Sequence, residues 1–305
     1  MKRFTTLDGV EKLAIAPVEV LGQGSWHARR AAHETRVDRW IQPHLARRRS
    51  GQAHPVEDFL FTYYSQRPAA LRRWHPGFGF ALQGSGAAEY HELKGYDGQG
   101  DEAAVSRCHV EAQRRLIASL HQLLTATAAR RPQLGCFGMH EWAMVYRLGQ
   151  DDVRHASWPL RLGASGTDEV VESHRIACSH FDAFRFFTPS ARPLNTVQPA
   201  REDRPAFEQP GCLHAGMDLY KHAFRLTPLV CSELVADCFE LAHDIRVLDM
   251  RASPYDLSSL GYSPVRVETP GGKQEYAAAQ RDFAARGAPL RQRLIDECER
   301  LLAVC

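Results

Sequence analysis

Apolar residues recur at helical spacing through much of the chain, and this periodicity limits the possible folds more than any other feature. Between 102 and 130, Val110, Ile117 and Leu124 follow one face of a helix, and Pro132 lies just beyond its end. We therefore expect one long amphipathic helix over this range. Such a helix buries its apolar stripe only against other elements.

Other segments carry the same helical pattern, and the candidate strands are few and short. The expected helices are 25–48, capped by Ser25 and stopped at Ser50-Gly51, then 217–226, 229–246 and 274–304, with a break at Gly287 and Pro289. Strands are expected at 78–82 and 158–162, with a mobile Gly-rich loop at 84–101 between the first strand and the long helix. The sequence thus predicts a mainly α fold with a few short β-strands.

The length of the chain sets its domain organisation. With 305 residues and 44% hydrophobic content, the chain can bury a sizeable core. We expect a flexible N-terminal arm over 1–24 and a single compact globular domain over 25–305.

The composition also indicates where in the cell the protein is located and whether its cysteines are oxidised. No run approaches the roughly 20 apolar residues that cross a bilayer, and the first residues lack the apolar core of a secretion signal. We expect a cytoplasmic protein that does not contact membranes. The eight cysteines contain no CxxC pair, so we expect reduced thiols rather than disulfides or a cysteine zinc site.

The net charge of +2 does not by itself indicate nucleic acid. The basic residues are, however, overwhelmingly arginine, whose planar guanidinium suits phosphates and stacks on bases. Local arginine clusters therefore carry more information than the total, and they lie at 29–30, 47–49, 72–73, 114–115 and 130–131.

The densest group of ionisable and aromatic side chains is HPVEDFLFTYYSQRPAALRRWHPGFG at 54–79. Pro55 is expected to begin a short helix, with Glu57 and Asp58 complementing its dipole in the first turn. Pro68 then biases Arg67 away from helical geometry. An arginine and tryptophan patch follows at a chain reversal, which makes the segment a candidate binding surface.

This segment resembles an actinobacterial-type family labelled 3-methyladenine DNA glycosylase, which shares a block of the form HPVxDFLFxYYxxRPxxLRRWHPG. Two further blocks carry the likeness, GCFGMHEWAMVYR at 135–147 and SHRIACSHFDAFRFFTP at 173–189. A looser similarity links the chain to antiphage glycosylases that excise modified cytosines. The Gly-rich hairpin and following catalytic Asp of well-studied alkylation-repair glycosylases are missing.

The resemblance implies a DNA glycosylase that hydrolyses the N-glycosidic bond of a damaged or modified base and leaves an abasic site, in DNA repair or in phage defence. DNA is then the partner, and no cofactor is implied. A lyase step normally employs an amine nucleophile. Lys221 is the one lysine in a dense candidate region, so a monofunctional hydrolase is expected.

Glycosidic cleavage needs a carboxylate near the sugar and a group that helps the base to leave. Glu141 is the first candidate because it lies among apolar residues that would desolvate it, and His140 is its candidate proton-handling partner. The structural alternative is an ion pair between Glu141 and Arg147 or Arg185.

Asp182 is the second candidate carboxylate, because it lies among phenylalanines with His180 close by. In a helix, Asp182 and Arg185 would share a face and satisfy each other. In an extended segment, His180 and Asp182 would point to the same side.

Extracting a base from a duplex also requires aromatic walls and contacts to phosphates. The candidate walls and ligands for the flipped base and the strand are Tyr63, Tyr64, Arg72, Arg73, Trp74, His75, Trp142, Arg185 and Lys221.

Two other classes of protein remain open. Fifteen histidines are enough for a metal or haem enzyme. The spacings of His174 with His180 and of His214 with His222 nevertheless fit no standard ligand pair, so no metal ligands are assigned. Separate histidines could still converge in space. The third interpretation is a non-catalytic DNA-binding module.

Overall fold

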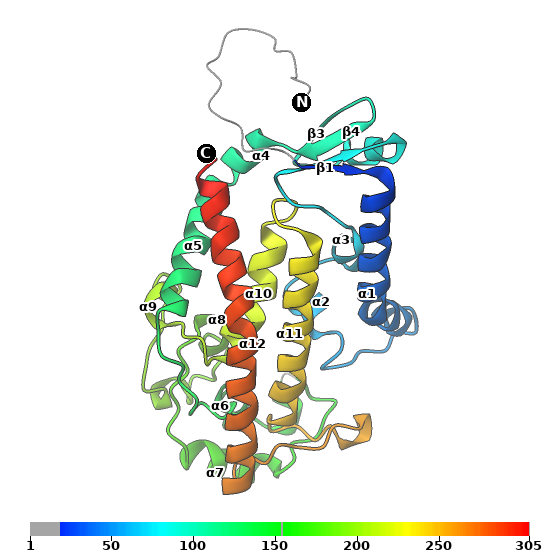
Figure 1. Cartoon of the computed structure of the whole chain (residues 1–305). Helices are drawn as coiled ribbons and strands as arrows, with labels where there is room; N and C mark the ends of the chain where they lie inside the picture. Colours follow the sequence, from blue (N-terminus) through cyan, green and yellow to red (C-terminus); the bar gives the residue numbers. More distant parts are fainter. Residues whose placement is uncertain (1–18, 154, 305) are drawn as a thin grey trace.

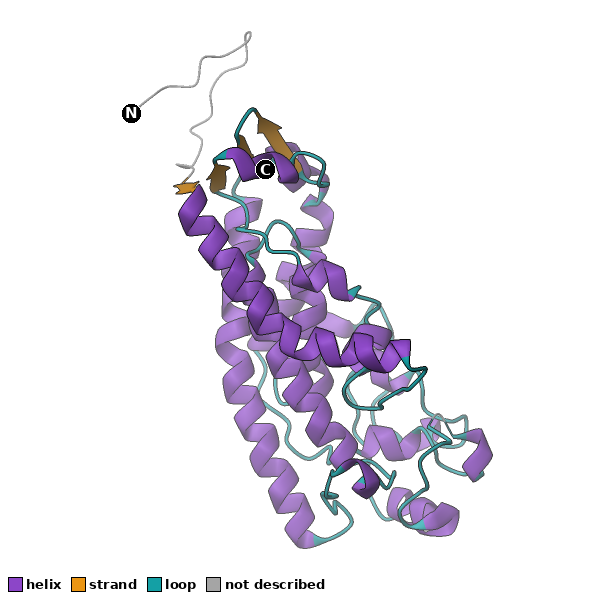
Figure 2. Ribbon diagram, turned by 90° about the vertical axis from the view of Figure 1, so that its right-hand side faces the viewer, coloured by secondary structure: helices purple, strands orange, loops and turns teal. Residues whose placement is uncertain are grey.

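The computed structural model describes residues 19–153 and 155–304 and shows a mainly helical molecule with one small sheet at one end (Figures 1 and 2). The predicted fold class is therefore confirmed. Of the arm expected over 1–24, residues 1–18 lie outside the described part, whereas Glu19–Gly22 form strand β1 and helix α1 begins at Gln23.

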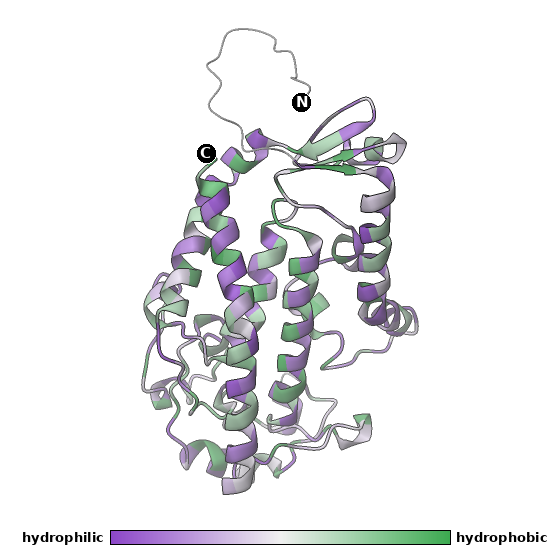
Figure 3. Ribbon diagram, in the orientation of Figure 1, coloured by the Kyte–Doolittle hydropathy of each residue, from purple (hydrophilic) through white to green (hydrophobic). Residues whose placement is uncertain are grey.

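The centre of the molecule is a group of four helices. They are α5 (Arg114–Ala128), α10 (Leu213–Arg225), α11 (Ser232–Arg251) and α12 (Pro270–Leu302). Helix α10 packs against both α11 and α12, and almost all of its side chains are buried. Helix α12 alternates between hydrophilic and hydrophobic stripes, as expected for a helix with one face on the bundle (Figure 3).

Helices α1 (Gln23–Arg49), α2 (Phe59–Tyr63) and α3 (Pro68–Arg72) cover the other side of α11. The core side of α1 carries Trp26, Val37 and Ile41, and the helix ends at the predicted Ser50-Gly51 stop. Ser25 does not cap it, because the helix starts two residues earlier after Gly22. Helix α2 starts later than Pro55, whereas Arg67 is extended before Pro68, as predicted.

The sheet has the strand order β1-β2-β4-β3, in which β1 runs parallel to β2 and the other pairs are antiparallel. Its other strands are β2 (Phe80–Gln83), β3 (Tyr96–Gln99) and β4 (Glu102–Val105). The strand predicted at 78–82 thus corresponds to β2. The loop expected at 84–101 is instead ordered as the 3-10 helix η1 (Ser85–Tyr90) and strand β3.

Two helix predictions need correction. The long helix expected over 102–130 is divided into β4, α4 (Arg107–Ala112) and α5, because 102–105 pair with both neighbouring strands. Helix α12 is continuous through Gly287 and Pro289. Gly287 lies against the side chains of Leu219 and Leu241, so tertiary packing holds the helix where local propensity favours a break.

Short elements cover the middle and the far end of the bundle, away from the sheet (Figure 1). These are α6 (Met139–Ala143), η2 (Gln150–Asp152), α7 (Gly163–Glu172), α8 (Phe181–Phe184), η3 (Arg192–Leu194), α9 (Arg204–Phe207) and η4 (Ser258–Leu260). The strand predicted at 158–162 is reduced to one isolated bridge between Leu160 and Tyr255. Helix α7 begins directly after this segment, at Gly163.

In the ranges 19–153 and 155–304, no helix combines the length and the apolar character that crossing a bilayer requires. The cysteines of these ranges are free thiols, and Cys178, Cys238 and Cys298 are buried. Cys108 is exposed.

Candidate functional site

A cleft of about 800 Å³ lies where α2, α5, α8, α9 and α10 meet. Five of the side chains predicted to act at the site line it together, although they come from three separate segments. They are Tyr63, Tyr64, Asp182, Arg185 and Lys221. Phe181 and Phe224 complete an aromatic part of the wall.

Asp182 lies in the first turn of α8 and faces two cations. Lys221 Nζ donates to Asp182 Oδ2 across 2.8 Å, and Arg185 Nε lies 3.4 Å from the other carboxylate oxygen. Burial would raise the pKa of Asp182, but the hydrogen bond and charge of Lys221 outweigh it and lower that pKa. The carboxylate is therefore anionic at neutral pH. The expected sharing of a helix face by Asp182 and Arg185 is confirmed.

The lining of the cleft is strongly cationic. Its five basic side chains, Arg185, Arg201, Arg204, Lys221 and Arg225, outnumber its two acids, Asp182 and Glu202. Arg201 and Arg225 are exposed, and neither has a carboxylate partner within the described ranges. Their guanidinium groups are available to an anionic ligand.

Asp218 anchors the floor of the cleft and is almost completely buried. It accepts hydrogen bonds from Tyr64 Oη at 2.9 Å and Arg204 Nη2 at 2.9 Å, and Lys221 Nζ lies 3.3 Å away. Burial favours a raised pKa, but contact with His180 and the charge of Lys221 hold the pKa of Asp218 well below its usual range. The Asp218 anion thereby positions three residues of the cleft wall.

His180 has a different partner from the one that an extended segment would give it. It precedes α8, and its Nε2 lies 3.4 Å from Asp218 and 3.6 Å from Glu208 rather than beside Asp182. The ring is fully buried, and its Nδ1 has no hydrogen-bond partner in the described structure. Of the two arrangements considered for this segment, the structure therefore has the helical one and not the extended one that would place His180 beside Asp182.

Glu141 and His140 lie on α6 in a second buried cluster below the cleft. Arg246 Nη1 bridges Glu141 Oε1 at 3.0 Å and Asp249 Oδ2 at 2.8 Å, and its guanidinium lies over the ring of Phe59. Glu141 thus has the structural ion pair considered above, but with Arg246. Arg147 pairs with Glu172 instead, and Arg185 with Asp182.

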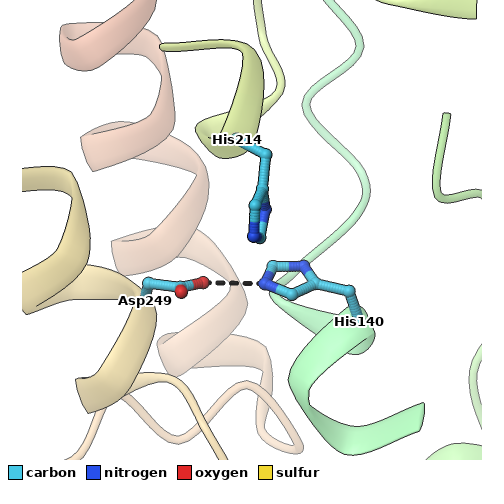
Figure 4. Close-up of side chains that lie close together, drawn as sticks. All are labelled: His140, His214 and Asp249. Atoms are coloured by element: carbon cyan, nitrogen blue, oxygen red, sulfur yellow. Dashed lines mark hydrogen bonds and ion pairs between the residues drawn. The ribbon is translucent and has the colours of Figure 1, made fainter. Parts of the chain in front are cut away.

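His140 contacts two groups from other helices. Its Nε2 is hydrogen-bonded to Asp249 Oδ1 at 2.8 Å, and its ring lies edge-on to His214, with centroids 4.4 Å apart. Figure 4 shows His140, His214 and Asp249 pointing toward one another from α6, α10 and α11. All three are buried. The fold thus brings His214, whose spacing to His222 fits no standard ligand pair, next to a histidine from another helix.

The remaining predicted ligands lie elsewhere or are inaccessible. Trp74 and Trp142 are at most 1% exposed, and their indoles donate to Glu233 and to the Ala252 carbonyl. His75 is buried against Tyr96. Neither tryptophan offers a free ring face, so their assignment as walls is corrected to core packing, and His75 belongs to the same core.

Arg72 and Arg73 line a separate hollow that shares no residue with the cleft. Arg72 is held by ion pairs with Asp38 at 2.9 Å and Glu34 at 3.1 Å. Arg73 is exposed. The patch is thus not part of the cationic wall around Asp182.

The two acids before α2 do not cap it. Asp58 pairs with His44 and Arg47 and accepts from the His54 backbone N–H. Glu57 accepts from His243 and from Tyr262. Long-range partners therefore replace the helix-dipole role expected from the sequence.

Asp218, Arg204, Arg246, Asp249 and His214 were missed at the sequence level. The sequence feature that could have revealed four of them is a polar or charged residue at a position on the apolar face of a helix. Asp218 and His214 lie on the buried helix α10, and Arg246 and Asp249 lie at buried positions of α11. Charged side chains at buried helical positions need partners, which here are one another.

Comparison of the chain with family models, with curated proteins and with solved structures gave no match.

Proposed function

We propose that the chain is a monofunctional DNA glycosylase whose reaction takes place in the cleft beside Asp182. The carrying observation is that an anionic carboxylate, aromatic rings and unpaired arginines line one cleft of about 800 Å³. That volume is in the usual range of ligand sites. The aromatic rings suit a nucleobase, the carboxylate suits the cationic sugar, and the arginines suit the phosphates.

Asp182 is the carboxylate that the reaction needs. When the C1′–N bond breaks, the base leaves with the electron pair and the sugar becomes cationic; water then adds to C1′ and loses one proton, which balances the proton that the base gains as it leaves. A lowered pKa keeps Asp182 charged, so it can stabilise the cation and orient the water. Glu141, held by Arg246, is assigned to support α6 rather than to this step.

Tyr63 and Lys221 are suited to help the base leave. Burial raises the pKa of Tyr63, and Asp218 and Asp182 raise that of Lys221 against the effect of burial. Both groups therefore retain their protons at neutral pH and can donate hydrogen bonds to the departing base. Tyr63 and Phe181 offer ring surface for stacking.

Arg201 and Arg225 bind the phosphates on either side of the flipped base. A second hollow of about 730 Å³ extends the cationic surface, since α9 lines both and the second is lined by Arg130, Arg131, Arg175 and Lys273 without any acid. The proposal includes DNA as the binding partner and the cytoplasm as the place where the protein acts. The resemblance described above supports the same chemistry, in repair or phage defence.

A base-release assay tests the proposal. The chain, treated with chelator in one arm, is incubated with oligonucleotides that carry alkylated bases or bulky modified cytosines, and released bases are identified by mass. We expect a free base and an alkali-labile abasic site without strand cleavage. Binding without release across the panel would indicate a non-catalytic DNA-binding module and overturn the proposal.

A further inference from the structure

We propose that His140, His214 and Asp249 form a binding site for one divalent transition-metal ion, with Zn²⁺ as the representative cation. The site is separate from the glycosylase proposal, because none of its three ligands lines the large cleft.

The geometry brings three ligand atoms of suitable type together. One atom each from His140, His214 and Asp249 lies within 4.8 Å of the other two. Two imidazoles and one carboxylate are a common protein ligand set for zinc and for non-haem iron. The three residues come from α6, α10 and α11, so the packing of the bundle fixes their positions (Figure 4).

Among the three proposed ligands, His214 is the one that no hydrogen bond holds in place. The residue is 6% exposed, and its ring forms no hydrogen bond with any residue in 19–153 or 155–304. Its ring nitrogens are not among the fully enclosed, unpaired polar atoms of these ranges. Its ring faces a second poorly satisfied histidine, His180, at a centroid distance of 5.3 Å. A metal ion at His214 would supply the missing partner.

The surroundings of Asp249 match those of a metal-binding carboxylate. Arg246 donates to Oδ2 at 2.8 Å, which orients the carboxylate and leaves Oδ1 toward His140. Arg246 is itself fixed by Glu141. Such outer partners orient the ligands of protein metal sites. The guanidinium of Arg246 thus lies between two buried carboxylates, those of Asp249 and Glu141.

Space beside the cluster is sufficient for a small additional ligand. A recess of about 20 Å³ is lined by His140 and His214, and this volume accommodates about one water molecule. A second recess is lined by His214, Glu141 and Arg246 and also by Tyr63 and Asp182, which belong to the cleft. His214 therefore borders a recess that shares two lining residues with the cleft.

The test is metal binding by the full chain after removal of metal with chelator. We expect one equivalent of Zn²⁺ to bind and to raise the melting temperature, since a ligand that binds the folded state stabilises it. His214→Phe should weaken binding by more than about 100-fold, because even loss of an outer partner costs about 10–100-fold. It should cost little stability, since His214 has no hydrogen bond to lose.

His222→Phe is the matched control, because His222 is equally buried on α10 and lies outside the cluster. It should bind Zn²⁺ like the unaltered chain. Equal binding by His214→Phe and the unaltered chain would overturn the proposal, as would the absence of one-to-one binding.

X-ray absorption at the zinc edge gives a measurement that needs no variant. Nitrogen and oxygen neighbours at about 2.0–2.1 Å with imidazole scattering are expected. Sulfur neighbours at about 2.3 Å would show that cysteines bind the ion and would overturn the assignment. The cysteines that line the same recess are Cys136, Cys178 and Cys212.

Discussion

Lys221 donates a hydrogen bond to Asp182 across 2.8 Å, and the same ammonium group lies 3.3 Å from the buried Asp218. One cation thus joins a carboxylate in the cleft wall to the carboxylate that anchors its floor. Both acids, the partly buried Asp182 and the fully buried Asp218, are kept ionised although burial alone would favour their neutral forms.

Removing the charge of Asp182 should abolish most base release. In Asp182→Asn, the loss of the group that stabilises the sugar cation is expected to lower the single-turnover rate by about 10²–10⁴-fold. DNA affinity should stay within a few fold. Glu202→Gln, which changes the other acid of the same cleft, should release base at the unaltered rate. Full activity of Asp182→Asn would remove it from the mechanism.

Lys221→Met should change the pH profile of the reaction. Without the ammonium group, burial dominates and the pKa of Asp182 rises, so the carboxylate is protonated at higher pH. The acidic limb of the single-turnover pH–rate profile should therefore move to higher pH. Lys273→Met, in the second hollow, should leave the limb in place. A fall in rate at every pH with the acidic limb unmoved would contradict this account.

Arg201 and Arg225 should contribute to the salt dependence of DNA binding. Each contact with a duplex phosphate contributes about 0.9 to the slope of log affinity against log salt concentration. The double variant Arg201→Gln, Arg225→Gln is expected to reduce the slope by up to about 1.8 for the same reason. Arg281→Gln, an exposed arginine of α12, is the control. Identical slopes for the double variant and the unaltered chain would place the DNA elsewhere.

The ion pair between Glu57 and His243 should stabilise the fold in a defined pH range. Contacts with Asp244 and Glu57 outweigh burial and raise the pKa of His243 from 6.5 to about 9, so its contribution is complete below 6.5 and lost as pH rises through about 9. The His243 hydrogen bond lowers the pKa of Glu57 from 4.5 to about 2, so its contribution is complete above 4.5 and lost as pH falls through about 2.

Glu57→Gln should therefore cost roughly 1 kcal/mol between pH 4.5 and 6.5 and almost nothing above about pH 9. The melting temperatures of the variant and the unaltered chain, measured across this range, check it. Tyr262→Phe removes a hydrogen bond to Glu57 without removing charge, so its cost should vary less with pH. A cost for Glu57→Gln that is equal at both ends of the range would exclude the ion pair as its cause.

Periodicity predicted the helices whose apolar stripe can be read within one segment. The stripe of Val37 and Ile41 identified α1, and the apolar run beyond Leu229 identified α11. Strand β4 was taken for helix, because its pairing partners lie in β2 and β3 and a local pattern does not record them. The continuity of α12 through Pro289 has the same cause, since neighbouring helices hold it.

Residues of the candidate site were predictable from the sequence where reactive and aromatic side chains lie close together in one segment. Asp182 was found from its aromatic surroundings, and Lys221 from its isolation among lysines. Trp74 and Trp142 were misassigned because large aromatic rings are as typical of cores as of binding walls. The partners of Glu141 and His140 lie on α11, more than a hundred residues away, and only the tertiary fold reveals them.

The antiparallel pairing of α10 and α11 limits how this chain can vary in length. His214 lies at the start of α10 and Asp249 near the end of α11. One residue inserted within α11 before Asp249 would rotate the rest of that helix by about 100° and turn the carboxylate away from both histidines. Among related sequences, insertions and deletions should therefore be absent within α10 after His214 and within α11 before Asp249, whereas the Gly-rich connections at the sheet end can change in length without disturbing the cluster.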